Sequence, residues 1–407
     1  MKKTFTRIVE VDNKRYYLYP DFLKCLSQDM AFEKLSEYFI EGDEIPFNND
    51  FFSFIGFTLT DECNTKCKYC FRECSAQKQI KKEIQFNEFE TLVKFFRKKL
   101  TEKNQNFKAI IHLSGGEIFV KPELEKYLEC ILKNGFKLAL NTNGISPEIR
   151  SSRYKKFLSD KNTIIRVSLD GHTSEIHEKY RQKGTFNKTV ENIKYLTEIN
   201  NNIQIKSVLS QTNSLYLEDF LEFLHGINVN YFTYNIIKKV GYAKDFTDNE
   251  IISESNIAKK LVKILEKKEH LAQLVSITRF CEFLNLMYNE NPQLNLGTPY
   301  RINHDGNVYP GDLASQEFLL GNIYEGTSLF LNGKIEDFKE KHDLYKKTCL
   351  SCDANRFCTK GRHDELFETD SSLEAEFPNC DDLRELFYYC LTLGQQGVDL
   401  LSLMRYH

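Results

Sequence analysis

The chain has 407 residues, 12 cysteines and a formal net charge of −3. This balance provides no global basic field, so we expect neither nucleic acid nor an anionic membrane as a partner. The basic N-terminus has no apolar run behind it, and no stretch approaches the roughly 20 apolar residues of a membrane helix. We therefore expect a cytoplasmic protein with reduced thiols, which favours metal ligation or catalysis over disulfides.

Residues 1–50 predict a short α+β segment. TRIVEV and RYYLY flank a DNK turn, which is typical of a β-hairpin. A helix is expected over about 21–40, and the acidic EGDEIPFNND stretch is typical of a linker.

From residue 51 to about 240, strand-like and helical stretches alternate. The strand-like runs are short, rich in β-branched and aromatic residues, and show little alternation, as strands buried on both faces do. They fall at 51–59, 108–116, 136–144, 162–171, 203–210 and 228–237. The expected helices fall at 87–104, 122–134, 147–159, 187–200 and 216–226. This order predicts a parallel α/β sheet, curled as a doubly wound sheet or an open barrel.

After about residue 240 the alternation stops, which indicates a second, smaller, loop-rich domain over 241–407. Residues 250–292 are expected to be helical. The segment RINHDGNVYPGD places an Asp-Gly turn between two short strands and predicts a hairpin. Most of the remaining cysteines cluster further on, at Cys349, Cys352, Cys358, Cys380 and Cys390.

Three cysteines follow the first strand of the α/β region. Cys63, Cys67 and Cys70 have the spacing C-x3-C-x2-C, and charged residues lie between them, which disfavours a chance cluster of core thiols. Three thiolates on one loop can hold three irons of a [4Fe–4S] cluster and leave the fourth iron open. Structural zinc prefers four ligands, and no histidine is near. Cys74 is either a fourth ligand or a buried free thiol.

The cysteine spacing and its place after a strand resemble the radical S-adenosylmethionine (SAM) superfamily. The resemblance covers about residues 51–240 and implies a partial (β/α)6 TIM-type barrel. In that family the open iron of the [4Fe–4S] cluster binds SAM, and one electron cleaves it to a 5′-deoxyadenosyl radical that abstracts hydrogen. In a barrel, the site lies at the carboxyl ends of the strands.

The resemblance also implies a set of SAM-binding residues. Tyr69 fits the aromatic position near the adenine, and Gly115-Gly116-Glu117 matches the GGE motif, in which bare backbone approaches the ligand and the glutamate accepts from its ammonium group. A Gly-Gly turn before a helix would explain the two glycines but not their place.

Four further strand-end positions match polar contacts of the same family. Asn141 and Asn143 correspond to residues near the ribose, and Ser168 and Asp170 to its ribose and carboxylate contacts, although Asp170 precedes a glycine and also suits a plain turn. Arg181, in KYRQKGTF, matches an arginine that pairs with the SAM carboxylate, although an arginine in a polar loop is usually just solvated.

The C-terminal cysteines resemble the SPASM domain, an iron–sulfur extension of peptide-modifying radical SAM enzymes. Cys349, Cys352, Cys358 and Cys380 match the ligands of one auxiliary [4Fe–4S] cluster, with Cys390 as a competing fourth ligand. The four positions of the usual second auxiliary cluster are vacant; Gly311 and Arg362 occupy two of them. The alternative for the first set is a structural zinc site.

Asp312 follows the vacant position at Gly311. In the related sulfatase-maturing enzymes an aspartate there is a candidate general base, and Asp312 is therefore a candidate catalytic residue. A plain Asp in a turn after Pro-Gly is the competing interpretation.

The SPASM resemblance implies a peptide or protein substrate, as in the maturation of ribosomally made peptides, with a cross-link or another oxidative modification as the product. An electron donor such as flavodoxin or ferredoxin is the second expected partner. Two explanations are open for the short segment before the barrel: it is a remnant of an element that binds the leader of the precursor peptide, or a separate protein binds that leader. Two alternatives remain open, a radical SAM dehydrogenase of a small molecule and an activase that installs a radical on a partner enzyme.

Overall fold

The structure is a computed structural model that describes residues 7–11, 14–18, 23–25, 54–76, 82–102, 109–275, 300–309, 319–331 and 380–395. Its centre is a nine-stranded sheet with the order β12-β11-β10-β4-β5-β6-β7-β8-β9. The first six of these strands along the chain run parallel to one another. They are β4 (Phe54–Thr60), β5 (Ile110–Gly115), β6 (Lys137–Thr142), β7 (Thr163–Ser168), β8 (Ile203–Leu209) and β9 (Tyr231–Ile236).

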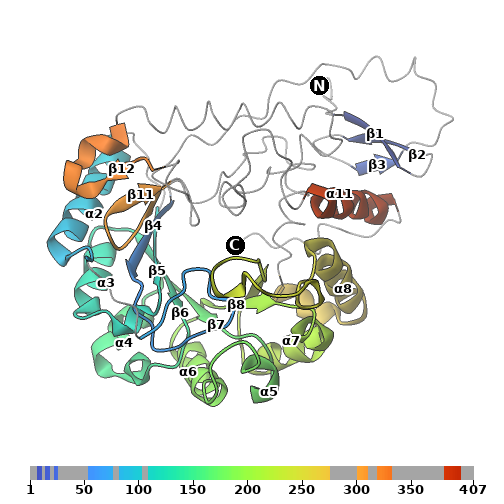
Figure 1. Ribbon diagram of the computed structural model, residues 1–407, viewed down its shortest axis with the longest axis horizontal. Helices are drawn as coiled ribbons and strands as arrows, with labels where there is room; N and C mark the ends of the chain where they lie inside the picture. Colours follow the sequence, from blue (N-terminus) through green and yellow to red (C-terminus); the bar gives the residue numbers. More distant parts are fainter. Residues whose placement is uncertain are drawn as a thin grey trace.

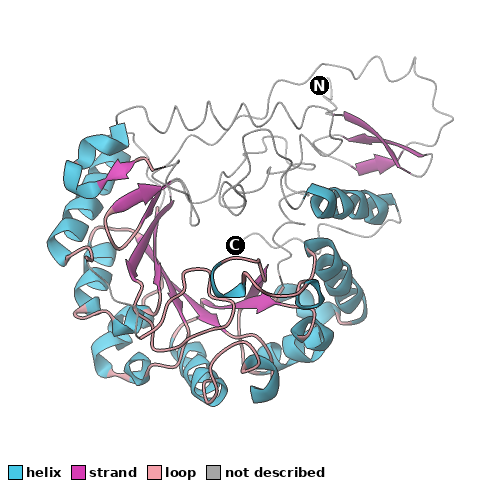
Figure 2. Ribbon diagram, viewed as in Figure 1, coloured by secondary structure: helices cyan, strands magenta, loops and turns pink. Residues whose placement is uncertain are grey.

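The sheet is curved, and helices cover its convex side (Figures 1 and 2). These helices alternate with the strands along the chain, which confirms the α/β class and the barrel alternative. They are α2 (Phe86–Glu102), α3 (Leu124–Lys133), α4 (Ser152–Leu158), α5 (Ser174–His177), α6 (Phe186–Ile199), α7 (Leu217–Gly226) and α8 (Glu254–Lys267).

Helix α2 shows why these helices lie on the sheet. Its buried residues are Phe89, Leu92, Val93, Phe96 and Leu100, which recur at the helical period and form one apolar stripe. Phe89 packs edge-on against Phe57 of β4, with the ring centroids 4.7 Å apart. Alternate residues of β4 therefore face the helices, and the residues between them face the concave side of the sheet.

The predicted hairpin after residue 300 is confirmed, and it lies in the central sheet. β10 (Tyr300–Ile302) pairs antiparallel with β11 (Asn307–Tyr309), and β12 (Gly321–Asn322) continues the sheet beyond β11. β10 also pairs in parallel with β4, with Arg301 opposite Gly56. The sheet therefore includes strands from both sides of the domain boundary predicted near residue 240, and that boundary stays a prediction.

The N-terminal hairpin is also confirmed, as β1 (Arg7–Val11) and β2 (Lys14–Leu18). The helix expected over about 21–40 is wrong at Leu23–Cys25, which form β3 and pair with β2. The open edge of a hairpin offers unpaired backbone groups, and pairing with them overrides local helix preference. Helix α11 (Cys380–Gln395) lies beside α8 and β3 (Figure 1).

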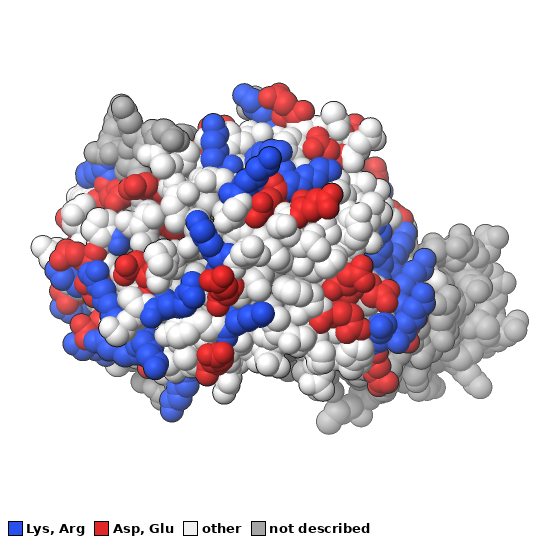
Figure 3. All heavy atoms as spheres, turned by 90° about the horizontal axis from the view of Figure 1, so that it is seen from below, with Lys and Arg blue, Asp and Glu red and all other residues white. Residues whose placement is uncertain are grey.

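The face shown in Figure 3 carries lysine and arginine interspersed with aspartate and glutamate. Among the helices that the structure describes, none is long and apolar enough to cross a membrane.

Candidate functional site

The loop of the three cysteines starts directly after β4. Cys63 is buried, Cys67 and Cys70 are half-buried, and all three are free thiols. Thr65 contacts two of them, with its hydroxyl 3.3 Å from the sulfur of Cys63 and 3.9 Å from that of Cys67. The loop thus presents three thiols at the carboxyl end of a parallel strand, as the sequence predicts for a barrel site.

The surroundings of the thiols differ in their effect on ionisation. Burial raises the pKa of Cys63 to about 11 and also raises the pKa of Cys67. The hydrogen bond with Cys74 is the main reason that the pKa of Cys70 falls to about 6, and the backbone N–H of Cys74 also donates to the Cys70 sulfur over 3.4 Å. Cys74 is only 3% exposed, which fits the buried-thiol alternative better than a fourth ligand.

The donor set fits an iron–sulfur cluster better than a single metal ion. Within the described ranges, no group of three His, Cys, Asp or Glu side chains converges closely enough to hold one ion. A cubic cluster does not need such convergence, because each thiolate binds a different iron. Buried Cys63 and half-buried Cys67 both have raised pKa values, so they form thiolates readily only when positive charge offsets their desolvation, and iron would supply that charge.

Gly115 ends β5, Gly116 follows it, and both pack directly against the start of the cysteine loop. A side chain on Gly116 would place its Cβ 2.1 Å from the carbonyl oxygen of Glu62. One on Gly115, which has a φ of +153°, would lie 2.3 Å from the carbonyl oxygen of Thr60. The backbone N–H of Gly116 donates to Thr60 over 2.8 Å. The close approach that these glycines permit is therefore between two backbone segments.

We expect Gly116→Ala to lower the free energy of unfolding by about 1–3 kcal/mol, because a backbone carbonyl has to move aside. Gly226→Ala is the matched control: a Cβ there meets nothing within 4 Å, so its effect should be close to zero or stabilising. Urea unfolding of both variants checks this. Equal stability of the two would mean that the loop start adjusts freely.

Glu117 is fully buried and holds the end of β6 against β5. One carboxylate oxygen accepts from the Thr142 hydroxyl over 2.7 Å and from the backbone N–H of Phe119 over 3.1 Å. The other accepts from the backbone N–H of Asn143 over 2.7 Å. Burial raises the pKa of Glu117, and these donors oppose the rise without cancelling it.

Asn143 joins β6 to the cysteine loop. Its side-chain amide donates to Asn64 over 2.7 Å and lies 4.0 Å from the Cys63 sulfur. Asn141, two residues earlier, has a buried side-chain oxygen without a hydrogen-bond partner in the described part of the chain. The structure therefore places Asn143 beside the thiols and leaves an acceptor available on Asn141.

Asp170 and Arg181 form a buried ion pair, with side chains 1% and 9% exposed. The guanidinium Nε donates to Asp170 over 2.6 Å, and the hydroxyl of Tyr69 donates to the same carboxylate. Ser207 and the backbone N–H of Val208 also donate to it, over 3.4 and 2.9 Å. Asp170 thus connects the cysteine loop, the end of β7 and β8.

In both members of this ion pair, neighbouring charges and hydrogen bonds together shift the pKa more than burial does. Burial alone raises the pKa of Asp170, but the charge of Arg181 and the hydrogen bonds outweigh it, and the net pKa is lowered. Burial lowers the pKa of Arg181, but Asp170, with smaller contributions from Tyr69 and Cys67, more than offsets this, so that its pKa is raised. Burial is also the main reason that the pKa of Tyr69 lies well above its ordinary value.

His177 was not predicted as a site residue, although it lies one helical turn before Arg181 in the sequence. It is 1% exposed, and its Nδ1 accepts from the backbone N–H of Asp170 over 3.2 Å. Burial lowers its pKa to about 4, with a smaller contribution from Arg181. A neutral ring that accepts at Nδ1 carries its proton on Nε2. This Nε2 is buried without a hydrogen-bond partner in the described part of the chain.

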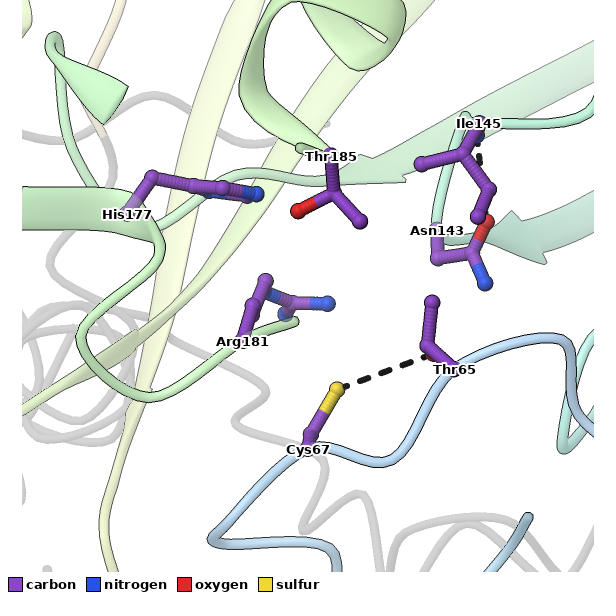
Figure 4. A pocket seen from close by; sticks show the side chains of 7 residues that line it. All are labelled: Thr65, Cys67, Asn143, Ile145, His177, Arg181 and Thr185. Carbon is purple, nitrogen blue, oxygen red and sulfur yellow. Dashed lines mark hydrogen bonds between the residues drawn. The ribbon is translucent and has the colours of Figure 1, made fainter. Parts of the chain in front are cut away.

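A small pocket brings these elements together (Figure 4). Its lining residues come from the cysteine loop, the segment after β6 and the segment around α5. They are Thr65, Cys67, Asn143, Ile145, His177, Arg181 and Thr185. The pocket therefore offers thiol, hydroxyl, amide and guanidinium groups to one ligand.

Several predicted residues are not placed in this site. Ser168 ends β7 and is half-buried. Asp312, Cys349, Cys352 and Cys358 lie outside the described residues. Cys380 is half-buried at the first residue of α11, whereas Cys390 is fully buried further along the same helix.

Residues 57–225 match the Radical SAM superfamily. The chain is similar to the antilisterial bacteriocin subtilosin biosynthesis protein AlbA of Bacillus subtilis, with 27% identity over 66% of this chain and 56% of AlbA. It is also similar to the cysteine-type anaerobic sulfatase-maturating enzyme of Clostridium novyi, with 25% identity over 81% of this chain and 92% of that enzyme.

Among solved structures, native anSMEcpe with bound AdoMet (SAM) and Cp18Cys peptide has the same fold. The TM-score is 0.69 at 20% identity, and the superposition covers 85% of this chain and 99% of that chain. The sequence match, the cysteine loop and the curved parallel sheet lead to one conclusion: residues 57–225 form a radical SAM domain.

Proposed function

We propose that the protein cleaves SAM reductively and removes hydrogen from a peptide or protein substrate, installing a cross-link or another oxidative modification. The observation that carries this proposal is the position of Cys63, Cys67 and Cys70. Three free thiols lie at the carboxyl end of a parallel strand, beside a pocket that contains Arg181. This arrangement supports a cluster with one open iron for a ligand.

The three thiolates of the loop would hold the [4Fe–4S] cluster. When bound, the cluster and SAM supply a one-electron cleavage to methionine and a 5′-deoxyadenosyl radical, which takes a hydrogen atom from the substrate. An external donor such as flavodoxin or ferredoxin would provide that electron.

The residues around the pocket would bind and orient SAM. Nε and Nη2 of Arg181 both donate to Asp170, so the N–H groups that remain on the guanidinium are the ones proposed to bind the SAM carboxylate. Nε2–H of His177 lines the same pocket and is a further donor. We assign the SAM ammonium group to Glu117, whose second oxygen has one protein donor. Tyr69, held by Asp170, would pack near the adenine.

The glycines and polar strand ends complete the proposed SAM site. Gly115 and Gly116 would let the cysteine loop lie against β5, so that the thiols and Glu117 keep a fixed relation. Asn141, Asn143 and Ser168 are proposed to contact the ribose.

We propose one auxiliary [4Fe–4S] cluster, held by Cys349, Cys352, Cys358 and Cys380. The half-buried start of α11 supports Cys380 over Cys390, because a thiolate is favoured at a helix N-terminus, whereas Cys390 packs in the hydrophobic core. This cluster would accept the second electron of the oxidation, and Asp312 would accept the proton that leaves the substrate.

The substrate class rests on the relatives. A bacteriocin biosynthesis protein matches 66% of this chain, and two sulfatase-maturating enzymes match 81% and 80% of it. A small-molecule dehydrogenase and an activase are not favoured by these relatives.

The test uses the anaerobically reconstituted protein with SAM, a one-electron reductant and, as the candidate substrate, any short peptide that is found to be encoded beside its gene. We expect 5′-deoxyadenosine to form and the peptide mass to fall by an even number of hydrogens. Formation of 5′-deoxyadenosine with unchanged peptide would contradict that substrate. Its absence under all conditions would contradict the radical chemistry itself.

A further inference from the structure

The turn after the last of the six parallel strands contacts the cysteine loop. A short 3-10 helix, Gly241–Ala243, follows β9. In the sheet, β5, β6, β7 and β8 stand between β9 and β4, the strand that the cysteine loop follows. The backbone N–H of Tyr242 nevertheless donates to the carbonyl oxygen of Cys70 over 3.1 Å. The segments that follow the first and the last parallel strand are therefore joined directly, at the third cysteine of the loop.

Gly241 allows these two segments to meet. Its φ is +55°, in the left-handed region that glycine adopts most readily. A Cβ there would lie 2.5 Å from the carbonyl oxygen of Cys70, 2.6 Å from that of Phe71 and 2.7 Å from the Cα of Phe71. All three of these atoms belong to the backbone, so no side-chain rotation would relieve the contact. A larger residue at this position would therefore push the cysteine loop away.

Tyr242 also holds the residues that follow Cys70. Its hydroxyl donates to the carbonyl oxygen of Glu73 over 3.0 Å, and the ammonium group of Lys66 lies 5.1 Å from the centre of its ring. The carbonyl oxygen of Cys70 accepts a second hydrogen bond, from the backbone N–H of Glu73 over 3.2 Å. Both lone pairs of this carbonyl are thus used, one within the loop and one by the turn.

The turn can support the loop because it is itself anchored. Ala243 is fully buried in a small hydrophobic cluster that includes Tyr180, and Tyr69 packs against this cluster. The backbone N–H of Lys68 donates to the carbonyl oxygen of Tyr180 over 2.8 Å. Since Tyr69 directly precedes Cys70, the same contacts fix the proposed adenine contact and the third thiol relative to one another.

The backbone position of Cys70 determines where its sulfur lies, because only the Cβ separates the sulfur from the Cα. The thiolates of a [4Fe–4S] cluster bind different irons of one rigid body, and the reduction potential depends on hydrogen bonds to the sulfurs. The Cys70 sulfur accepts such a bond, from the backbone N–H of Cys74 over 3.4 Å. We propose that the turn Gly241–Ala243 is a positioning element for the catalytic cluster. Through Gly241 and Tyr242 it sets where the Cys70 thiolate meets its iron.

The inference rests on the proposed function, and it adds residues from beyond β9 to the support of the cluster site. The test compares Gly241→Ala with Gly135→Ala in the full-length protein, reconstituted without oxygen. Gly135 is the matched control: its φ is also positive, at +75°, but a Cβ there would make only an ordinary contact, with a side-chain atom 3.6 Å away.

Three quantities are measured for each protein: the iron content, the electron paramagnetic resonance spectrum of the reduced protein with and without SAM, and the equilibrium affinity for SAM. The spectrum contains the signals of every reduced cluster. The signal of the catalytic cluster is the part that is missing when Cys63, Cys67 and Cys70 are replaced with alanine.

We expect Gly241→Ala to change the shape of the catalytic signal and its response to SAM, and to lower the affinity for SAM by roughly tenfold or more. Complete loss of that signal, with iron falling from about eight to about four per chain, would be the stronger form of the same result. Gly135→Ala should keep the wild-type iron content, spectrum and affinity.

Tyr242 supplies a second pair of variants, which decides the matter if Gly241→Ala does not fold. Tyr242→Ala removes the hydrogen bond to Glu73 and the ring beside Lys66, and should change the same signal to a smaller extent. Tyr242→Phe keeps the ring and should lie between Tyr242→Ala and the wild type.

A turn with only a structural role would give a different result. Folded Gly241→Ala, or Tyr242→Ala in its place, would then unfold at a lower temperature but keep the wild-type spectrum and SAM affinity, and this outcome would overturn the inference. A wild-type protein without any signal that responds to SAM would count against the proposed function itself. The two proposals can therefore fail separately.

Discussion

Replacing Cys63, Cys67 and Cys70 together with alanine is expected to abolish reductive SAM cleavage. With one catalytic and one auxiliary [4Fe–4S] cluster, the wild type should contain about eight irons per chain and the variant about four. The physical reason is that the three thiols share one loop after β4, so that removing them removes every protein ligand proposed for the catalytic cluster. Iron and sulfide analysis with detection of 5′-deoxyadenosine checks both parts.

Cys130→Ala is the control for this experiment. Cys130 is a buried thiol on α3, in the hydrophobic core, and its loss should leave the iron content unchanged. About four irons falling to none, with zinc present, would identify the C-terminal cysteines as a structural zinc site. About twelve irons in the wild type would mean that a second auxiliary cluster has ligands outside the expected positions.

Asp170→Ala is expected to lower the free energy of unfolding by about 3–5 kcal/mol, because Arg181 is left as a buried charge without its partner. The same change removes the acceptor for Tyr69, so SAM affinity should fall as well. Urea unfolding and equilibrium SAM binding, both without oxygen, measure the two effects.

Two controls distinguish the charge from the loss of a side chain. Arg150→Ala breaks an exposed pair and should cost at most about 1 kcal/mol. The double replacement Asp170→Leu with Arg181→Met removes both charges and should recover much of the lost stability, but not SAM binding. A double variant as unstable as Asp170→Ala would show that packing dominates.

The same pair predicts a dependence of stability on pH. The folded state lowers the pKa of Asp170, so the stability from its carboxylate is fully present above the ordinary aspartate pKa. It is lost as the pH falls through the lower folded pKa. Asp170→Asn should therefore lose less stability than the wild type on acidification, and parallel acid unfolding curves would contradict this.

Much of the barrel was predictable from the sequence, because its signals are local. The six parallel strands overlap the runs expected from short β-branched and aromatic stretches, and their ends differ from those runs by a few residues at most. The third expected helix, 147–159, is a 3-10 turn at Pro147–Arg150 followed by α4. The cysteine spacing after β4 was equally visible, since it depends only on neighbouring residues.

Other features were decided by the tertiary structure. Leu23–Cys25 form a strand because a hairpin edge is available, and β10 joins the central sheet beside β4. The glycines of the GGE motif are required by a backbone contact with the cysteine loop, which no local pattern reveals.

The polar residues of the barrel interior show most clearly which features the sequence alone could not predict. The guanidinium of Arg301 lies over Gly56, which is far from it in the sequence, because β10 pairs with β4. The proton position on His177 likewise depends on the backbone N–H of Asp170, which only the folded chain brings to the ring. By itself, the sequence determined the helices and strands of the barrel and the loop of three cysteines, because hydrophobic periodicity and cysteine spacing depend on residues that are near neighbours in the chain. The contacts of these polar side chains were decided by the assembly of the sheet, because it joins residues that are distant along the chain.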